Sequence, residues 1–385
     1  FGAEYDEIVG SEGGDWVLAR ELTFRLFLRC LRSMPRDKAV GAGGFSIALL
    51  VAAGREVQFQ FFSALKADVL AVLEGRSQCM SVEWKRVLYA LLKKPPPNDP
   101  RCVSGRREIA LMPHDLKLFM QMLKVAAYDR VVGRVAPAQM GWAAGFGCTD
   151  PSITLQMVVQ QSRRAKQPLY ILYLDLATFF PKVQRRLATV GEVLLGLPLD
   201  VSRLALLIYG GYRGDPDAVR CQYDSEAGLG KPFDNWMGWL MGCVLSPDKS
   251  RILLNSVAVA IQAKVNGAKL WGFGEKHRGP SRGEAAQAWR AVAHVMFGDD
   301  WAGLSGGAGE IELAWAMWVE WESISGAKIG IKGFKKTVLS GVCYSDTGVA
   351  RTVPDLRLTL PSGVRVPLLP HDQAYKHLGR WTCAN

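Results

Sequence analysis

Three acidic residues follow two apolar segments that lie far apart in the sequence. Asp175 ends the apolar run that starts at Leu169, and Asp299 and Asp300 follow the apolar run Ala291–Phe297. Burying carboxylates at the end of a hydrophobic strand costs free energy unless a cation or hydrogen bonds compensate. Mg²⁺ prefers oxygen ligands and is usually held by carboxylates together with substrate phosphates. The three acids therefore indicate a two-metal phosphoryl-transfer site, in which one ion activates an attacking hydroxyl and the other holds the leaving pyrophosphate.

A simpler interpretation of the second acidic pair is a turn between two strands. Gly298, Asp299 and Asp300 form a tripeptide whose residue types are favoured in tight turns. Taken alone, this tripeptide is more typical of a turn than of a metal site, so the surrounding segments must decide between the two.

The elements that would carry these acids can be predicted from the apolar pattern. Residues 169–175 are continuously apolar and β-prone, which is typical of a strand buried on both faces, and residues 291–297 predict a second strand. From residue 336 onward the pattern predicts short strands with Gly and Pro turns. Apolar spacing predicts helices over 58–73, 113–130, 151–164, 183–195, 199–209, 247–265 and 308–324.

Composition limits the class of protein. The chain has 385 residues, of which 49% are hydrophobic and 22% charged, so it can bury a large interior over two or three domains or subdomains. A net charge of +11 favours polyanionic partners such as nucleic acid. The eight cysteines show no metal-ligand spacing, and free thiols suit an intracellular compartment, without separating nucleus from cytoplasm. No segment has the length of a membrane span, so no membrane partner is expected.

A series of motifs, taken in order, resembles the reverse transcriptases of the non-LTR retrotransposon and group II intron type. The first acid lies in Tyr-Leu-Asp-Leu-Ala-Thr-Phe-Phe, similar to the first palm motif of that family, and Phe-Gly-Asp-Asp is similar to its aromatic-x-Asp-Asp hairpin. The other similar segments are 38–47, 84–111, 139–150, 238–247, 325–337 and 375–379.

This resemblance implies an α+β, right-hand polymerase fold of fingers and palm, in which an antiparallel palm sheet packs on helices. The implied ranges are an unassigned N-terminal extension over 1–37, fingers over 38–165, and a palm over 166–350. Residues 351–385 would hold strands that include a hairpin similar to the family's primer grip. We expect the chain to be a fragment of a longer polypeptide, with the thumb absent and lying beyond Asn385.

The resemblance also implies a role for individual residues. The catalytic residues would be Asp175, Asp299, Asp300 and Lys336, with Lys336 protonating the pyrophosphate and Lys335 as its competitor. The metal ligands, for two Mg²⁺ ions with Mn²⁺ as a substitute, would be Asp175, Leu176 (through its carbonyl), Asp299 and Asp300. The nucleotide-binding residues would be Lys94, Arg107, Leu176, Phe180, Met241 and Gly242. The primer-grip residues would be Tyr375, Leu378 and Gly379.

The function implied is an RNA-directed DNA polymerase from a retroelement, which adds dNTPs to the 3′-hydroxyl of a DNA primer on an RNA template. The sequence departs from the family's pattern at Met241 (usually Gln), Ala143 (usually Arg) and Gly43 (usually Asp), and these changes leave the acids intact. The oligomeric state is not predicted.

Two alternative functions stay open. A viral-type RNA-dependent RNA polymerase also carries Gly-Asp-Asp, but it needs a polar residue a few positions after the first acid, where this chain has Phe179 and Phe180. A catalytically decayed, retroelement-derived nucleic-acid-binding protein would keep the fold and the basic surface without turnover.

Two further sequence features have both a functional and a structural interpretation. The basic stretches 163–166 and 182–186 are either contacts to a template–primer duplex or solvated helix faces. Trp315, Trp318 and Trp321 recur at helical spacing, which favours core packing over base stacking.

Overall fold

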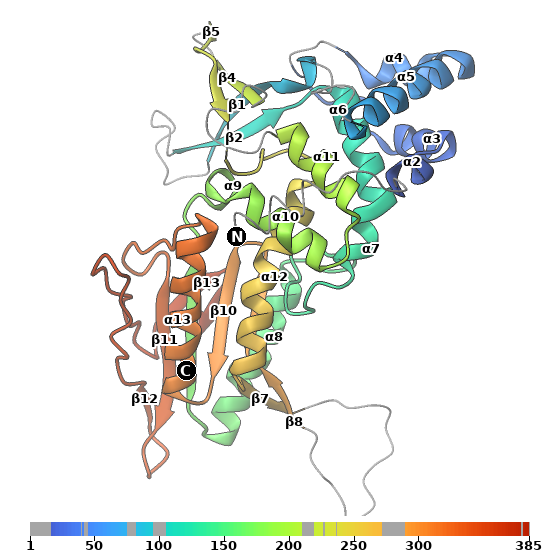
Figure 1. Ribbon diagram of the computed structural model, residues 1–385. Helices are drawn as coiled ribbons and strands as arrows, with labels where there is room; N and C mark the ends of the chain where they lie inside the picture. Colours follow the sequence, from blue (N-terminus) through green and yellow to red (C-terminus); the bar gives the residue numbers. More distant parts are fainter. Residues whose placement is uncertain are drawn as a thin grey trace, which may run out of the picture. The chain divides into compact units, whose positions relative to one another are not determined.

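The computed structural model describes residues 17–39, 41, 45–74, 82–94, 105–209, 219–225, 228–235, 237–271, 289–378 and 380–384 (Figure 1). The chain forms two compact units. Unit 1 comprises the described residues of Phe1–Val135 and Phe180–Leu253, and unit 2 those of Ala136–Phe179 and Leu254–Asn385. Both units combine helices with β-sheet, which confirms the α+β class. The fingers and palm ranges stay predictions.

Unit 1 contains a sheet in the order β2-β1-β4-β5, with β6 also paired to β4. Its strands are β1 (Arg86–Lys93), β2 (Arg106–Leu111), β4 (Val219–Ser225), β5 (Gly228–Leu229) and β6 (Phe233–Asn235). Its helical elements are α2 (Val17–Glu21), α3 (Phe24–Ser33), α4 (Ile47–Ala52), α5 (Arg55–Leu73), η1 (Val82–Lys85), α6 (His114–Leu123), η3 (Lys124–Tyr128), α7 (Asp129–Val132), α10 (Arg185–Leu194) and α11 (Leu199–Tyr209). The helix α9 (Phe179–Lys182) begins at the boundary between the units, and α12 (Ser246–Lys264) extends across it.

Helix α3 lies in the region to which the sequence pattern assigned no structure. Its N-terminus is capped by Thr23, whose hydroxyl accepts a hydrogen bond from the Leu26 amide at 3.2 Å. One face is apolar and packs into the core of unit 1, while the opposite face carries basic side chains. The buried residues are Leu26, Phe27, Cys30 and Leu31.

A buried ion pair crosses the core of unit 1. Lys249 on α12 pairs with Glu192 on α10, and the side chains are 1% and 0% exposed. The Tyr128 hydroxyl donates a hydrogen bond to the same carboxylate at 3.0 Å. The Lys249 ammonium also lies 5.4 Å from the Tyr128 ring centre and 5.2 Å from that of Trp239. Two aromatic faces and one carboxylate therefore replace the water that this ammonium loses on folding.

Unit 2 is built on an antiparallel sheet in the order β12-β11-β3-β10-β9, with β3 at its centre. Its strands are β3 (Leu169–Asp175), β9 (His294–Phe297), β10 (Asp300–Ser305), β11 (Val338–Tyr344) and β12 (Ala350–Thr352). Two separate hairpins pair β7 (Ala268–Trp271) with β8 (Trp289–Val292), and β13 (Ala374–His377) with β14 (Arg380–Cys383). The prediction of a buried strand over residues 169–175 is confirmed for Leu169–Leu174, whereas Asp175 at its end is partly exposed.

Helices cover both faces of this sheet. Helix α13 (Ala308–Ser325) packs on β3 and β10 (Figure 1), and Trp318 lies edge-on to Trp301 of β10, with ring centres 5.5 Å apart. Trp315, Trp318 and Trp321 are buried, which confirms the prediction that they are core residues. On the other face, residues of α8 (Thr149–Ala165) form one apolar cluster with alternate residues of β3 and β10.

The prediction of one strand over residues 291–297 is wrong in one respect. The chain breaks at Ala293, so the segment is divided between β8 and β9, which belong to different sheets. Gly267 has φ +77°, and a Cβ on it would lie 2.4 Å from the Ala293 nitrogen. The two backbones therefore approach closely where the strand is interrupted, and the apolar run of residues 291–297 contains no sign of that tertiary contact.

Two observations bear on the environment of the protein. In the described parts of the chain, no helix combines the length and the apolar character that crossing a bilayer requires. The described cysteines are free thiols, and they are Cys30, Cys148, Cys221, Cys243, Cys343 and Cys383.

Candidate active site

The structure brings the two distant acidic segments together in the middle of the unit 2 sheet, where β3 ends and β10 begins. In the antiparallel pairing of β3 with β10, Asp300 is the direct cross-strand partner of Asp175. Directly opposed residues project from the same face of a sheet, with Cβ atoms about 5 Å apart. Asp299 is the next residue along the chain and lies in the two-residue turn between β9 and β10. The turn interpretation is therefore confirmed, and the fold also brings the three acids close to one another.

The turn that carries Asp299 is held by a residue from another part of unit 2. Gly298 has φ +66° at the first turn position, where this kind of hairpin needs glycine. The buried Gln139 side chain accepts from the Gly298 amide at 3.0 Å and donates to its carbonyl at 2.9 Å. Its oxygen also accepts from the Gly141 amide at 3.0 Å. Gln139 thus positions the turn, a role that its place in a motif did not reveal.

Replacing Gln139 with Leu is expected to destabilise unit 2 by about 2–3 kcal/mol, since three hydrogen bonds are lost and buried backbone groups of the turn are left unsatisfied. The Gly298 amide should also lose its protection in hydrogen exchange. The matched control is Met140→Leu, because Met140 contacts Met296 through its backbone amide, at 2.9 Å, which the substitution keeps. Equal protection of Gly298 in both variants would contradict the assigned role.

The three carboxylates repel one another. Burial and, to a smaller extent, the neighbouring charges of Asp299 and Asp175 together raise the pKa of Asp300 to about 7, against the opposing effect of Lys336. Burial also raises the pKa of Asp299, with a further contribution from Asp175. Like charges at one site favour protonation or binding of a cation. The three acids therefore form a cluster whose negative charge Lys336 does not fully balance.

The raised pKa of Asp300 should make the free energy of unfolding depend on pH. An aspartate with a pKa near 4 in the unfolded chain and about 7 in the folded protein binds its proton more tightly when folded. Its contribution is fully present below about pH 4 and is lost as the pH rises to about 7, at up to about 1.4 kcal/mol per pH unit. Without divalent cations, the free energy of unfolding should fall across this window. In Asp300→Asn the slope should be much smaller, and an unchanged slope would contradict the assignment.

Asp175 is held by groups from the segment 328–337. Its Oδ1 lies 2.7 Å from Nζ of Lys336, and its amide donates to the Thr337 hydroxyl at 3.2 Å. Its carbonyl accepts from the Gly330 amide at 2.8 Å, and a Cβ on Gly330 would lie 3.0 Å from Oδ2. Leu176 is buried and forms a β-bridge with Ile329. The sequence indicated Lys336 as a general acid, but not its ion pair with Asp175 or the contacts made by Thr337 and Gly330.

The donor chemistry of this site fits a divalent cation. Oδ2 of Asp175 is buried and, within the described residues, accepts no hydrogen bond. Asp175 lies next to two carboxylates, those of Asp299 and Asp300, whose pKa values are raised by burial and further by the charge of Asp175. Within the described part of the chain, however, no three His, Cys, Asp or Glu side chains already form a metal-binding group. Binding an ion would therefore require the acidic side chains to reorient, and the Lys336 contact with Asp175 to weaken.

The hairpin predicted as a primer grip is next to this site within unit 2. Tyr375 on β13 stacks on the buried Tyr173 of β3, with ring centres 4.3 Å apart, and its hydroxyl donates to the Lys336 carbonyl. The charges of Asp175 and Asp300 add to the effect of burial in raising the pKa of Tyr375. Leu378 has φ +50° at the hairpin turn. Gly379, also predicted for this site, lies outside the described residues.

The remaining predicted site residues belong to unit 1. Arg107 is exposed on β2, and Lys94 follows β1, where its amide donates to Gly105 at 2.9 Å. The segment of Met241 and Gly242 lies against β2: the Met241 carbonyl accepts from the Ala110 amide at 2.6 Å. A Cβ on Gly242, whose φ is +106°, would lie 2.9 Å from the Ala110 carbonyl, so glycine permits this contact.

Phe180 is half-buried on α9, and its carbonyl accepts from the Trp239 amide at 2.6 Å. Within unit 1, this bond places Phe180 next to Trp239, two residues before Met241. The preceding Phe179 is buried, as expected of a core residue.

Neither interpretation of the basic stretch 182–186, as a contact to a duplex or as a solvated helix face, holds for Arg185. Its side chain is 2% exposed and donates to the carbonyl of Gly238 at 2.7 Å and to the side-chain oxygen of Asn235 at 2.8 Å. It also donates to the Tyr209 carbonyl. Arg185 instead holds Asn235, Met237 and Gly238, since its five donors can satisfy several oxygen atoms at once. A basic sequence stretch cannot distinguish this role from a surface contact.

Comparison with known proteins does not identify a family for this chain. No model of a protein family matches the sequence, and no curated protein matches it significantly.

Proposed function

We propose that this chain is an RNA-directed DNA polymerase, which extends a DNA primer on an RNA template by transferring nucleotides from dNTPs. The observation that carries the proposal is the cross-strand pairing of Asp175 with Asp300, with Asp299 in the adjacent turn. These two paired acids are 125 residues apart in the sequence and lie on one face of the sheet although they repel each other. A functional site is where proteins retain such an unfavourable arrangement.

In this proposal each residue of the acidic site has a chemical role. Asp175, Asp299, Asp300 and the Leu176 carbonyl would hold two Mg²⁺ ions. When bound, Mg²⁺ supplies activation of the attacking hydroxyl and neutralisation of the phosphate charge. Lys336, whose ammonium is 2.7 Å from Asp175, donates a proton to the leaving pyrophosphate as a general acid. Tyr375, which bonds to the Lys336 carbonyl, orients that residue.

The unit 1 residues would bind the incoming nucleotide and the template base. Arg107 and Lys94 would neutralise the triphosphate. Phe180 would exclude a ribose 2′-hydroxyl, and the contact of Met241 and Gly242 with β2 would form the floor of the template-base pocket. These roles rest on the resemblance of the motifs to the reverse transcriptase family.

The test is primer extension by the purified chain on a primed RNA template with Mg²⁺ and either dNTPs or rNTPs. Extension with dNTPs, abolished by Asp299→Asn, is the expected result. The matched control is Asp346→Asn, which removes the same charge from an exposed turn and should leave extension unchanged. Extension with rNTPs alone would overturn the proposal in favour of an RNA polymerase. RNA binding without any extension above the Asp299→Asn level would indicate a non-catalytic nucleic-acid-binding protein.

A further inference from the structure

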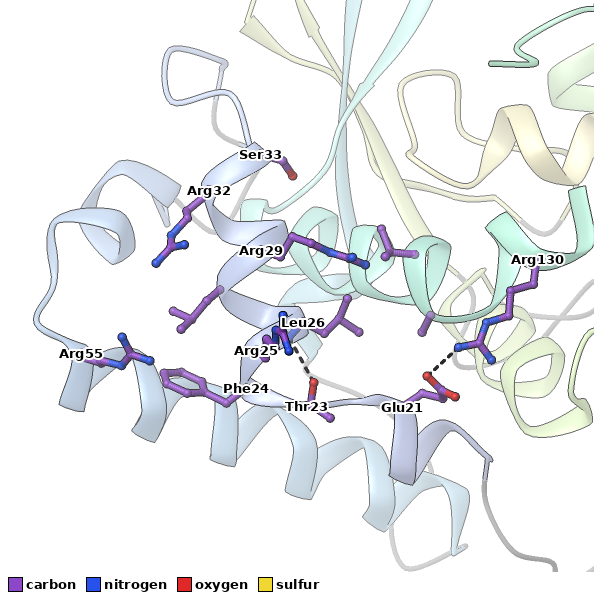
Figure 2. A pocket seen from close by; sticks show the side chains of 13 residues that line it. Glu21, Thr23, Phe24, Arg25, Leu26, Arg29, Arg32, Ser33, Arg55 and Arg130 are labelled. Atoms are coloured by element: carbon purple, nitrogen blue, oxygen red, sulfur yellow. Dashed lines mark hydrogen bonds and ion pairs between the residues drawn. The ribbon is translucent and has the colours of Figure 1, made fainter. Parts of the chain in front are cut away.

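A basic cavity in unit 1 is unrelated to any residue assigned above. It has a volume of about 1050 Å³ and is lined by α3, the ends of α2 and α5, and the η3–α7 region. Five of its lining residues are arginines, and Glu21 is the one acid among the described residues that line it. Figure 2 shows the side chains, which are those of Glu21, Thr23, Phe24, Arg25, Leu26, Leu28, Arg29, Arg32, Ser33, Arg55, Val125, Ala126 and Arg130.

The positive charge of this cavity is mostly uncompensated. Glu21 forms an ion pair with Arg130 at 2.9 Å, seen at one end of the cavity in Figure 2. Arg25, Arg29 and Arg32 extend from the exposed side of α3, spaced four and three residues apart. That spacing places them along one helix face, with neighbouring Cβ atoms about 5–6 Å apart. Together with Arg55, they bring four guanidinium groups to the cavity, for which the lining supplies no second acid.

Aromatic rings lie next to these charges. The Arg55 guanidinium is 5.7 Å from the centre of the Phe24 ring, and Figure 2 shows these two side chains next to each other. Phe24 in turn packs edge-on against Phe59 of α5, with ring centres 5.2 Å apart. Phe59 is 48% exposed, so one large ring is accessible next to Phe24, although Phe59 does not line the cavity itself. Such a pairing of cationic groove and accessible aromatic rings suits phosphates and unpaired bases together.

We infer that this arginine-lined cavity binds single-stranded RNA, with its guanidinium groups on the phosphates and a base against Phe59 and Phe24. A concave site disfavours a flat membrane surface, and an acidic peptide would leave the aromatic rings without a matching partner. RNA is favoured because its loops and ends present unpaired bases next to a continuous phosphate backbone. This inference goes beyond the proposed polymerase and needs neither metal ion nor nucleotide.

The test is binding of a labelled 12-nucleotide RNA to the full chain in EDTA, at several salt concentrations. In the triple variant Arg25→Gln, Arg29→Gln, Arg32→Gln, the dissociation constant should rise at least about tenfold, the effect of losing one charge-assisted hydrogen bond. The salt slope should fall by about 2, since each phosphate contact to a single strand contributes about 0.7. The three side chains are exposed, so the variant should melt at the same temperature as the unmodified protein.

Matched variants separate site binding from general attraction to a basic protein. Lys264→Gln, Arg351→Gln, Arg357→Gln removes the same charge from exposed positions of unit 2 and should change the dissociation constant less than twofold. Equal weakening in both triple variants would overturn the site. Phe59→Ala should weaken RNA about fivefold or more, but leave inorganic polyphosphate unaffected because that probe has no bases.

Other probes test the identity of the ligand. The assignment to RNA would be overturned if polyglutamate competed as well as RNA of equal charge. It would also be overturned if DNA of the same sequence bound more tightly than RNA. Asp299→Asn should bind the RNA normally, so loss of polymerase activity and loss of this site give different results.

Discussion

Replacing Asp175 with Asn is expected to lower primer extension at least about a thousandfold, which corresponds to about 4 kcal/mol of transition-state stabilisation. Asn keeps the shape of the side chain but removes the charge that would hold a metal ion. The protein should nevertheless be as stable as before or slightly more stable. The lost ion pair involves Lys336, which is 43% exposed and hence screened by water, while the repulsion with Asp300 is removed.

Extension rates and melting temperatures of the same preparations give the test. Lys336→Ala is the informative comparison, because it removes the same ion pair and leaves the anion cluster less compensated, so it should lower the melting temperature. A variant Asp175→Asn that extends primers at the normal rate, or that loses activity only because it unfolds, would contradict a catalytic role for this residue.

Replacing Lys249 with Met is expected to destabilise the protein by about 3–5 kcal/mol, since it leaves the carboxylate of Glu192 buried without a counter-charge. Glu192 is 0% exposed, and its Oε2 already lacks a hydrogen-bond partner among the described residues. After the substitution, the Tyr128 hydroxyl would be the one remaining hydrogen-bond donor to this carboxylate among the described residues. Urea unfolding followed by tryptophan fluorescence measures the change.

The double variant Lys249→Met, Glu192→Gln should recover at least half of the lost stability, because no charge is then buried and Tyr128 keeps an acceptor. The matched control is Lys264→Met on the same helix, where the side chain is exposed and the effect should stay within about 0.5 kcal/mol. A double variant that is less stable than Lys249→Met alone would show that the pair itself, and not the unpaired charge, dominates.

The sequence alone determined the elements that depend on local pattern. The buried strand over residues 169–175 and the tryptophan-rich helix over 308–324 are found within one residue of their predicted ends. Continuous apolarity and helical spacing are properties of neighbouring residues, so these predictions needed no distant contacts. The same applies to the turn at Gly298, where the residue type itself favours positive φ.

Other features were decided only by the tertiary structure. The cross-strand register that pairs Asp175 with Asp300 depends on how two strands align whose paired residues are 125 positions apart, and a shift of one residue would turn the side chains to opposite faces. Likewise, Arg185 and Arg29 look alike in sequence, but one satisfies buried carbonyls and the other lines an open cavity. A side chain's role depends on which groups surround it after folding, and that is set by packing between segments that the local pattern does not connect.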